Sequence, residues 1–206
     1  MAIFQAFRAL RPVPDKAEAV AALPYDVVTR EEAKEIGDQN PDSFLHVDRA
    51  EMDLPADTDL YDQKVYDRAR ENLINMEKNG ILVQDGAPCY YIYELTRKGK
   101  TQTGLVGCCS IDDYMNGVVK KHELTREDKE QDRIHHVDVC DANTGPIYLA
   151  CKYPQELLDL METWKASHDA VYDFVAEDEI GHRVWVIDGE AEKKVIAEQF
   201  GNIPYI

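Results

Sequence analysis

Apolar residues recur at helical spacing in the second quarter of the chain, and this pattern predicts an amphipathic helix. The apolar positions are separated by four, four, four and three residues: Tyr61, Val65, Ala69, Leu73 and Met76. Asn79 and Gly80 follow directly and are typical of a helix C-terminus. We expect this helix to pack against a sheet through Val65, Ala69, Leu73 and Met76.

Start and stop signals predict three shorter helices. Thr29 is a good N-cap for a helix that ends near Gly37. Pro154 can open a helix that continues to Ala166, and a last helix is expected from about Glu190 to Phe200. Helices therefore occur along the whole chain.

Alternating apolar and polar positions between these helices predict strands that pair as hairpins. Residues 89–111 predict a hairpin that turns at Lys98 to Lys100, and residues 170–188 predict a second that turns at Glu179 to Gly181. Single strands are expected at 3–8, 43–48, 117–121 and 147–152. The side chains expected to face the core are Tyr91, Tyr93, Leu105, Val106, Ile147 and Tyr148. The mixture of hairpins and helices favours an α+β fold with a mixed or mainly antiparallel sheet.

The charge of the chain excludes some classes of partner. Its 206 residues include 40 acidic and 23 basic ones, giving a formal net charge of -17. A field of this sign repels polyanions, so we expect neither nucleic acid nor an anionic membrane as a partner. No segment has the length and apolarity of a membrane span. The five cysteines form no Cys-x-x-Cys pair, and this odd number favours reduced thiols and a cytoplasmic protein.

Two acidic or histidine-containing segments could bind a cation, but a polar surface explains both. Residues 51–62 hold five acidic residues and no basic one, in a spacing that does not match a calcium-binding loop. His135 and His136 are adjacent and diverge by about 100° on a helix. Asp132 with His136, or His135 with Asp138, could share a helix face. We predict no metal site in either segment.

The stretch KKHELTREDKEQDR, residues 120–133, contains the strongest candidate for catalytic chemistry. Thr125 is a good N-cap, Asp128 could complete a weak capping box, and the helix would begin near Arg126. His122 and Glu123 would then lie beside unpaired backbone N–H groups that favour an anion. The pair is either a base next to a phosphate site or two exposed polar residues that lead into a helix.

Several segments, in order along almost the whole chain, resemble the domain-of-unknown-function family numbered 1015. They are FRALRP near the start, LPYDVV at 23–28, NPDSFLHV at 40–47, NGIL at 79–82, KKHELT at 120–125, Arg133, NTGPIYL at 143–149 and GHRVWVID at 181–188. In that family the segment that resembles NIPYI, residues 202–206, is followed by Ala-Asp-Gly-His-His-Arg. The resemblance implies that residues 1–206 are one α+β N-terminal portion of a longer protein.

The His-Glu pair followed by Asp-Gly-His-His-Arg is similar to the signature of free serine kinases, which have the fold shared by ParB partition proteins and sulfiredoxin. The resemblance implies that Glu123 is the base that deprotonates the serine hydroxyl. It implies that His122 contacts phosphate or substrate, and that ATP or ADP with Mg²⁺ is the phosphate donor. Thr125, at the expected helix start, and Arg133, which belongs to the resemblance to family 1015, are further candidates for contact with phosphate or substrate. Such chemistry requires a positioned carboxylate and cations around the phosphates.

These observations lead to one main expectation and two alternatives. The main expectation is a nucleotide-dependent kinase of a small hydroxylated metabolite, with free L-serine as the best guess and with little activity in residues 1–206 alone. The alternatives are a ParB-like nucleotide-binding switch without kinase activity and a structural interaction domain. Binding of ATP, ADP and CTP, with and without serine and magnesium, would separate the first two.

Overall fold

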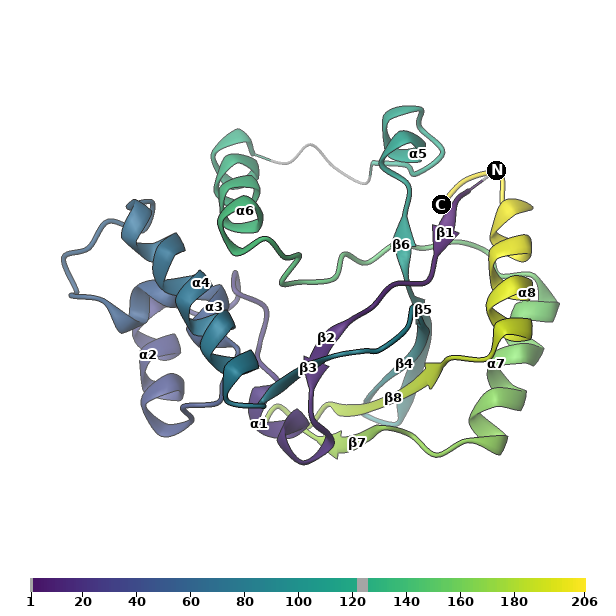
Figure 1. Cartoon of the computed structure of the whole chain (residues 1–206), viewed down its shortest axis with the longest axis horizontal. Helices are drawn as coiled ribbons and strands as arrows, with labels where there is room; N and C mark the ends of the chain where they lie inside the picture. Colours follow the sequence, from purple (N-terminus) through teal and green to yellow (C-terminus); the bar gives the residue numbers. More distant parts are fainter. Residues whose placement is uncertain (1, 122–125) are drawn as a thin grey trace. The chain divides into compact units, whose positions relative to one another are not determined.

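The chain has an α+β fold made of two compact units (Figure 1). The computed structural model describes residues 2–121 and 126–206. One unit, here called the sheet unit, contains the described residues 2–14, 84–121 and 148–206. The other, the helical unit, contains the described residues 15–83 and 126–147. The short elements η1 (Pro14–Lys16) and β3 (Leu82–Gln84) lie where the chain passes from one unit to the other.

An antiparallel sheet of four strands organises the sheet unit, in the order β5-β4-β8-β7. Its strands are β4 (Tyr90–Arg97), β5 (Lys100–Val106), β7 (Tyr172–Val175) and β8 (Gly181–Ile187). Both predicted hairpins are confirmed. The tight turn between β4 and β5 has positive φ at both Lys98 (50°) and Gly99 (74°), a backbone that matches the twist of a two-residue hairpin.

Two helices, α7 (Gln155–Ser167) and α8 (Glu190–Gly201), run side by side in this unit (Figure 1). Both begin and end close to the predicted residues. They share a core with the sheet that includes Ile92, Leu157, Trp185 and Ile196, each 2% exposed or less. The apolar face of the sheet is therefore covered by two helices that come late in the sequence.

The prediction that Tyr91 and Tyr93 of β4 face the main core was wrong, because the residues that face it are their neighbours in the strand. Tyr90 and Ile92 belong to the core shared with α7 and α8, and Leu105, opposite Ile92, packs against it as predicted. Tyr91 is buried elsewhere, with its ring 5.4 Å from that of Phe7. Because side chains alternate along a strand, a shift of one residue exchanges the two faces. Tyr93 and Val106 are only half-buried.

Two predicted strands of the sheet unit are absent from the described residues. Residues 147–152 form no strand, and Ile147 and Tyr148, predicted to be buried, are 79% and 77% exposed. Residues 117–121 are also irregular. There the backbone N–H of Lys120 donates to the carbonyl of Ile206 at 2.7 Å, and the N–H of Ile206 donates to the carbonyl of Val118 at 2.9 Å.

The first predicted strand, at 3–8, is interrupted. Its pieces are β1 (Phe4–Gln5), which pairs with β6 (Cys108–Cys109), and an isolated bridge between Phe7 and Cys89. The strand β2 (Leu10–Pro12) follows, and the short helix α5 (Ile111–Met115) comes after β6.

The helical unit contains α1 (Ala17–Val20), α2 (Arg30–Gln39), α3 (Leu45–Asp48), η2 (Ala50–Asp53), α4 (Gln63–Lys78) and α6 (Glu127–Cys140). The predicted cap at Thr29 is confirmed, since Thr29 and Glu32 form a reciprocal capping box. The segment 43–48, predicted as a strand, instead contains the helix α3. Its six residues are too few for periodicity to distinguish a strand from a helical turn.

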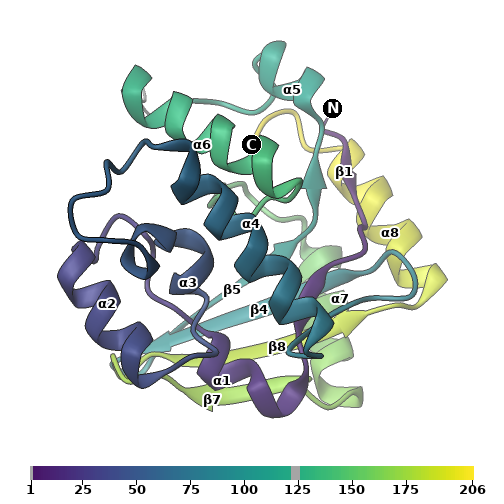
Figure 2. The ribbon, with the colours of Figure 1, turned by 60° about the vertical axis from the view of Figure 1, so that its left-hand side comes forward.

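The predicted amphipathic helix is α4, and its buried face contains Val65, Ala69, Leu73 and Met76 as expected. Tyr61 precedes the helix and is half-exposed. The packing partners of α4 are α3, η2 and α6 of its own unit (Figure 2). The prediction that this helix packs against the sheet was therefore wrong. Within residues 2–121 and 126–206, none of the helices has the length and apolarity needed to cross a bilayer.

Candidate functional site

The helix α6 begins at Glu127, one residue after the start that the sequence predicts near Arg126. Its N-cap is Arg126, with the extended dihedral angles that this position requires, whereas the cap predicted at Thr125 lies outside the described residues. The Asp128 carboxylate pairs with the Arg126 guanidinium at 2.7 Å. His122, Glu123 and Thr125 themselves lie outside the described residues. Of the four predicted site residues, the structure therefore describes only Arg133.

Acidic side chains occupy the first turn of α6. They are Glu127, Asp128 and Glu130. Carboxylates at this position stabilise the helix because they interact favourably with its positive end. For the same reason they reduce the attraction of this helix end for a phosphate, which the sequence analysis placed there.

Arg133 lies one turn further along α6 and is held on two sides. Its Nε atom donates to Oδ2 of Asp132 at 3.0 Å, and its Nη2 atom lies 2.8 Å from the same oxygen in an ion pair. Its guanidinium lies over the ring of Tyr25, 4.3 Å from the ring centroid. The Tyr66 hydroxyl donates to the other Asp132 oxygen at 2.8 Å, and burial together with this carboxylate raises the pKa of Tyr66. The plane of the guanidinium is thus fixed from its face and from one edge.

The loop that carries Tyr25 is fixed by Arg49, which follows α3. Nη1 of Arg49 donates to the carbonyls of Tyr25 and Val28, both at 2.7 Å. Nε of Arg49 donates to the Glu51 carboxylate at 2.6 Å. Arg49 is therefore a positioning residue for the aromatic surface beneath Arg133.

Arg133 and Tyr25 line an open depression of about 570 Å³ in the helical unit. The other lining residues are Lys129, Glu130, Ile134, Val137, Asp138 and Asn143. The wall thus combines two cations, two carboxylates, an amide, an aromatic ring and two aliphatic side chains. Apart from Arg133, these residues were not predicted as site residues, although Tyr25 and Asn143 belong to the quoted segments LPYDVV and NTGPIYL.

A second polar group in the helical unit is buried. Nε2 of His136 lies 3.8 Å from Oδ1 of Asp48, and that oxygen has no hydrogen-bond partner among the described residues. Burial raises the pKa of Asp48, whereas burial and the nearby Arg133 lower the pKa of His136 to about 4. Burial also raises the pKa of the neighbouring Cys140 thiol to about 11. His136 is therefore neutral near pH 7, and Cys140 is a poor nucleophile.

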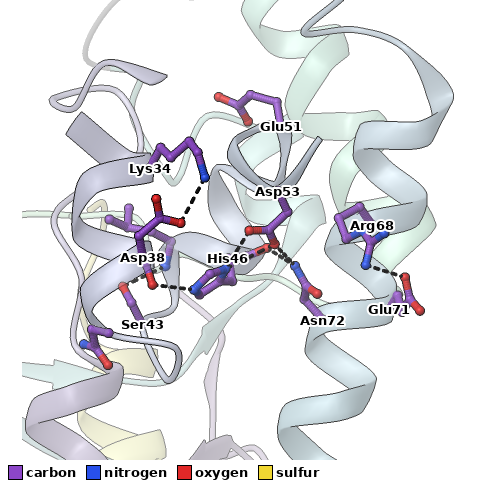
Figure 3. Close-up of polar contacts among 12 residues, drawn as sticks. Lys34, Asp38, Ser43, His46, Glu51, Asp53, Arg68, Glu71 and Asn72 are labelled. Carbon is purple, nitrogen blue, oxygen red and sulfur yellow. Dashed lines mark hydrogen bonds and ion pairs between the residues drawn. The ribbon is translucent and has the colours of Figure 1, made fainter. Parts of the chain in front are cut away.

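A third polar group, which the sequence analysis missed, joins α3, η2 and α4 (Figure 3). Nδ1 of His46 contacts the Asp53 carboxylate at 2.9 and 3.1 Å. Asn72 donates to the His46 carbonyl at 2.6 Å and to Asp53 at 2.8 Å. Nε2 of His46 lies 3.3 Å from the Gly37 carbonyl, so both ring nitrogens are used inside the fold. The spacing of seven residues between His46 and Asp53 gives no sequence signal for this contact.

The described residues contain no group of three or more histidine, cysteine, aspartate or glutamate side chains placed to hold a metal ion. Comparisons with curated proteins and with solved structures found no match. A family model described as "Protein of unknown function (DUF1015)" matches residues 4–206, almost the whole chain. The chain therefore belongs to the DUF1015 family.

Proposed function

We propose that the protein is a nucleotide-dependent kinase of a small hydroxylated metabolite, and that free L-serine is the first substrate to test. The observation that carries this proposal is the depression lined by Arg133. Arg133 belongs to α6, and this helix comes just after residues 122–125 in the sequence. A phosphotransferase needs fixed cations near a carboxylate base, because most of its catalysis is positioning and electrostatic stabilisation.

Each predicted site residue has a role in this proposal. Glu123 accepts the proton of the substrate hydroxyl as the hydroxyl oxygen attacks the γ-phosphate of ATP or the β-phosphate of ADP, and the bond to the bridging oxygen breaks to release ADP or AMP. His122 contacts the transferred phosphoryl group, as the resemblance to serine kinases implies, and Thr125 is given the same role because it comes just before the helix α6 in the sequence. Arg133 binds the substrate, and Mg²⁺ arrives with the nucleotide, since this ion is usually bound through substrate phosphates and few carboxylates.

The test is turnover by the full-length product of the gene. ATP or ADP is supplied with Mg²⁺, and serine and a panel of polyols are the acceptors. Glu123→Gln keeps the shape of the side chain but removes the base, so the turnover rate should fall about a hundredfold or more while nucleotide binding persists. Glu127→Gln is the matched control, because Glu127 is an exposed carboxylate in the first turn of α6.

Two outcomes would contradict this proposal. Unchanged turnover in Glu123→Gln would remove Glu123 from catalysis. Nucleotide binding by the wild type without turnover of any acceptor would favour the ParB-like switch.

A further inference from the structure

We propose that His46 is a pH-sensitive switch in the helical unit: its doubly protonated ring holds the C-terminus of α2, and loss of one proton to solvent releases that helix end. The switch is independent of the proposed kinase function, since it involves neither the depression at Arg133 nor residues 122–125. The contacts of the two ring nitrogens carry the proposal (Figure 3).

Both ring nitrogens of His46 face hydrogen-bond acceptors. Nδ1 lies 2.9 and 3.1 Å from the two oxygens of the Asp53 carboxylate, and Nε2 lies 3.3 Å from the carbonyl oxygen of Gly37. A neutral imidazole has one N–H group and can donate to only one of these partners, whereas the imidazolium donates to both. The two contacts together therefore require the protonated ring.

The carbonyl of Gly37 needs a donor from outside its own helix. Gly37 lies in the last turn of α2, and the N–H group that would continue the helical hydrogen bonds to it belongs to residue 41. That residue is a proline, which has no N–H group. Nε2 of His46 takes this place, and a positive charge near the C-terminal end of a helix is favourable in itself.

The His46 ring can approach α2 this closely because residue 37 has no side chain. A Cβ atom at position 37 would lie 3.2 Å from both Cε1 and Nε2 of His46, and 2.5 Å from Cε of Met52. Glycine inside a helix is destabilising relative to alanine, so the contact with His46 offsets a cost in α2 itself.

Asp53 keeps the proton on His46. Burial raises the pKa of Asp53, but the hydrogen bonds from His46 and Asn72 outweigh this effect and lower the pKa below its usual value. The bond to Asp53 in turn raises the pKa of His46 above 6.5 in spite of its partial burial. Asp53 is therefore ionised wherever His46 titrates, and the proton belongs to the imidazole.

The other charged side chains near His46 are engaged elsewhere. They form the pairs Lys34 with Asp38, Arg49 with Glu51, and Arg68 with Glu71, while Asp48 faces His136. Of these groups, Arg68 also favours the ionised form of Asp53. Asp53 is thus the carboxylate on which the charge of His46 depends.

Loss of a proton breaks the contact with Gly37 and keeps the contact with Asp53. The remaining proton stays on Nδ1, where it faces a full negative charge, so the lone pair of Nε2 then faces the carbonyl oxygen. Solvent can take the proton, because the His46 side chain is 20% exposed. The hold on α2 is complete below the unfolded pKa near 6.5 and is lost as the pH rises through the higher folded pKa.

The experiment measures hydrogen exchange of the full-length gene product at about pH 6 and about pH 9. Protection factors are compared, since they remove the intrinsic dependence of exchange on pH. We expect amides in the last two turns of α2 to lose protection at least about tenfold at the higher pH, because a hydrogen bond from a charged donor is lost. Amides of α4 should change much less. An NMR titration of the His46 ring in the same protein should have its midpoint above pH 6.5.

Two variants assign the effect to His46. His46→Gln retains a hydrogen-bond donor but does not titrate, so the protection of α2 should be the same at both pH values. His135→Gln is the matched control, because His135 belongs to the same unit and its ring contacts Gln63 of α4 at 2.8 Å. It should retain the pH dependence of the wild type.

Several results would overturn the switch. They are a titration of His46 at or below pH 6.5, equal protection of α2 at both pH values in the wild type, and an unchanged pH dependence in His46→Gln. If α2 and α4 lose protection equally, the proton stabilises the whole helical unit and the release of α2 is wrong. The wild-type measurements do not depend on the folding of either variant.

Discussion

Arg49 donates a hydrogen bond of 2.7 Å from Nη1 to the carbonyl oxygen of Tyr25. This contact joins the end of α3 to the loop before α2, although the two residues are 24 positions apart in the sequence. Arg49 thereby positions the Tyr25 ring beneath Arg133, although Arg49 itself does not line the depression.

Arg49→Met should destabilise the protein strongly. The side chains of Arg49 and Glu51 are only 15% and 7% exposed, so the substitution leaves a buried carboxylate without its partner and two carbonyls without their donor. Loss of one partner of a buried ion pair typically costs about 3 to 5 kcal/mol. The free energy of unfolding in urea measures this loss.

Two variants control this prediction. Arg68→Met breaks a pair with Glu71 whose side chains are 38% and 58% exposed, and it should cost no more than about 1 kcal/mol. In the double variant Arg49→Met with Glu51→Gln, the loss should be smaller than the sum of the two single losses. Additive losses would show that Arg49 does not stabilise the fold through Glu51.

Asp53→Asn should destabilise the protein more at about pH 6 than at about pH 9. The hydrogen bond that the His46 ring donates to Asp53 raises the pKa of His46 above its usual 6.5, so the folded state binds a proton more tightly than the unfolded state. The resulting stability is fully present below the unfolded pKa and is lost as the pH rises through the folded pKa. We expect a loss of about 1.5 to 3 kcal/mol on the acidic side, because the hydrogen bond involves charged groups.

Asp38→Asn is the matched control for Asp53→Asn. Asp38 forms an exposed i,i+4 pair with Lys34 in the same part of the helical unit (Figure 3). Its loss should cost less than about 0.5 kcal/mol and should not reproduce the difference between the two pH values. An equal loss at both pH values in Asp53→Asn would mean that His46 does not carry a proton in the pair.

The types of most elements could be predicted from the sequence, but the directions of their side chains could not. Hairpin turns and helix caps are local, so Lys98 with Gly99 and the Thr29 capping box were identifiable. Residues 90–93 are all apolar or aromatic, so no alternation shows which of them face the core. In residues 147–153 the chain turns Leu149, Cys151 and Tyr153 toward the core, whereas Tyr148 was expected there.

The candidate site was only partly predictable for a different reason. Arg133 was identified, but its partners come from segments far away in the sequence, and their contact depends on tertiary packing. Arg49, for example, donates to the Tyr25 carbonyl. In the sequence, however, Arg49 cannot be distinguished from an arginine on the protein surface. The unpaired oxygen of Asp48 has no sequence signal at all, because only burial makes it unusual.

Asp48→Asn should stabilise the protein by about 1 kcal/mol near neutral pH, in contrast to most substitutions. Burial raises the pKa of Asp48 by more than the Thr144 hydroxyl and the charge of Arg133 lower it, so the charged carboxylate costs stability above its folded pKa. Removal of the charge removes that cost, and the gain should shrink as the pH falls and Asp48 becomes protonated. Thermal unfolding at several pH values measures both effects.

Asp132→Asn provides the opposite control for Asp48→Asn. The Asp132 carboxylate accepts hydrogen bonds from Tyr66 and Arg133, so its loss should destabilise the protein. If Asp48→Asn is equally destabilising, the contacts of the Asp48 carboxylate with Thr144 and Arg133 must offset its burial.

Gly107→Ala should disturb the core of the sheet unit. A Cβ atom at position 107 would lie 2.5 Å from Cζ of Phe4, closer than the two atoms can approach. The Phe4 ring cannot move freely, because it stacks on Phe200 and Tyr90 with centroid distances of 4.1 and 5.2 Å. Overpacking of this kind typically costs about 1 to 3 kcal/mol. The free energy of unfolding in urea tests the prediction.

Gly104→Ala is the matched control, since an added Cβ there meets no atom within 4 Å and Gly104 lies in the strand β5. It should leave the free energy of unfolding unchanged or raise it by up to about 1 kcal/mol, because alanine restricts the unfolded chain. The clash itself is tested by Phe4→Leu combined with Gly107→Ala. Leucine has no atom where the Phe4 ring meets the new methyl group, so the double variant should lose less stability than the sum of the single losses. Additive losses would show that the cost of Gly107→Ala does not come from Phe4.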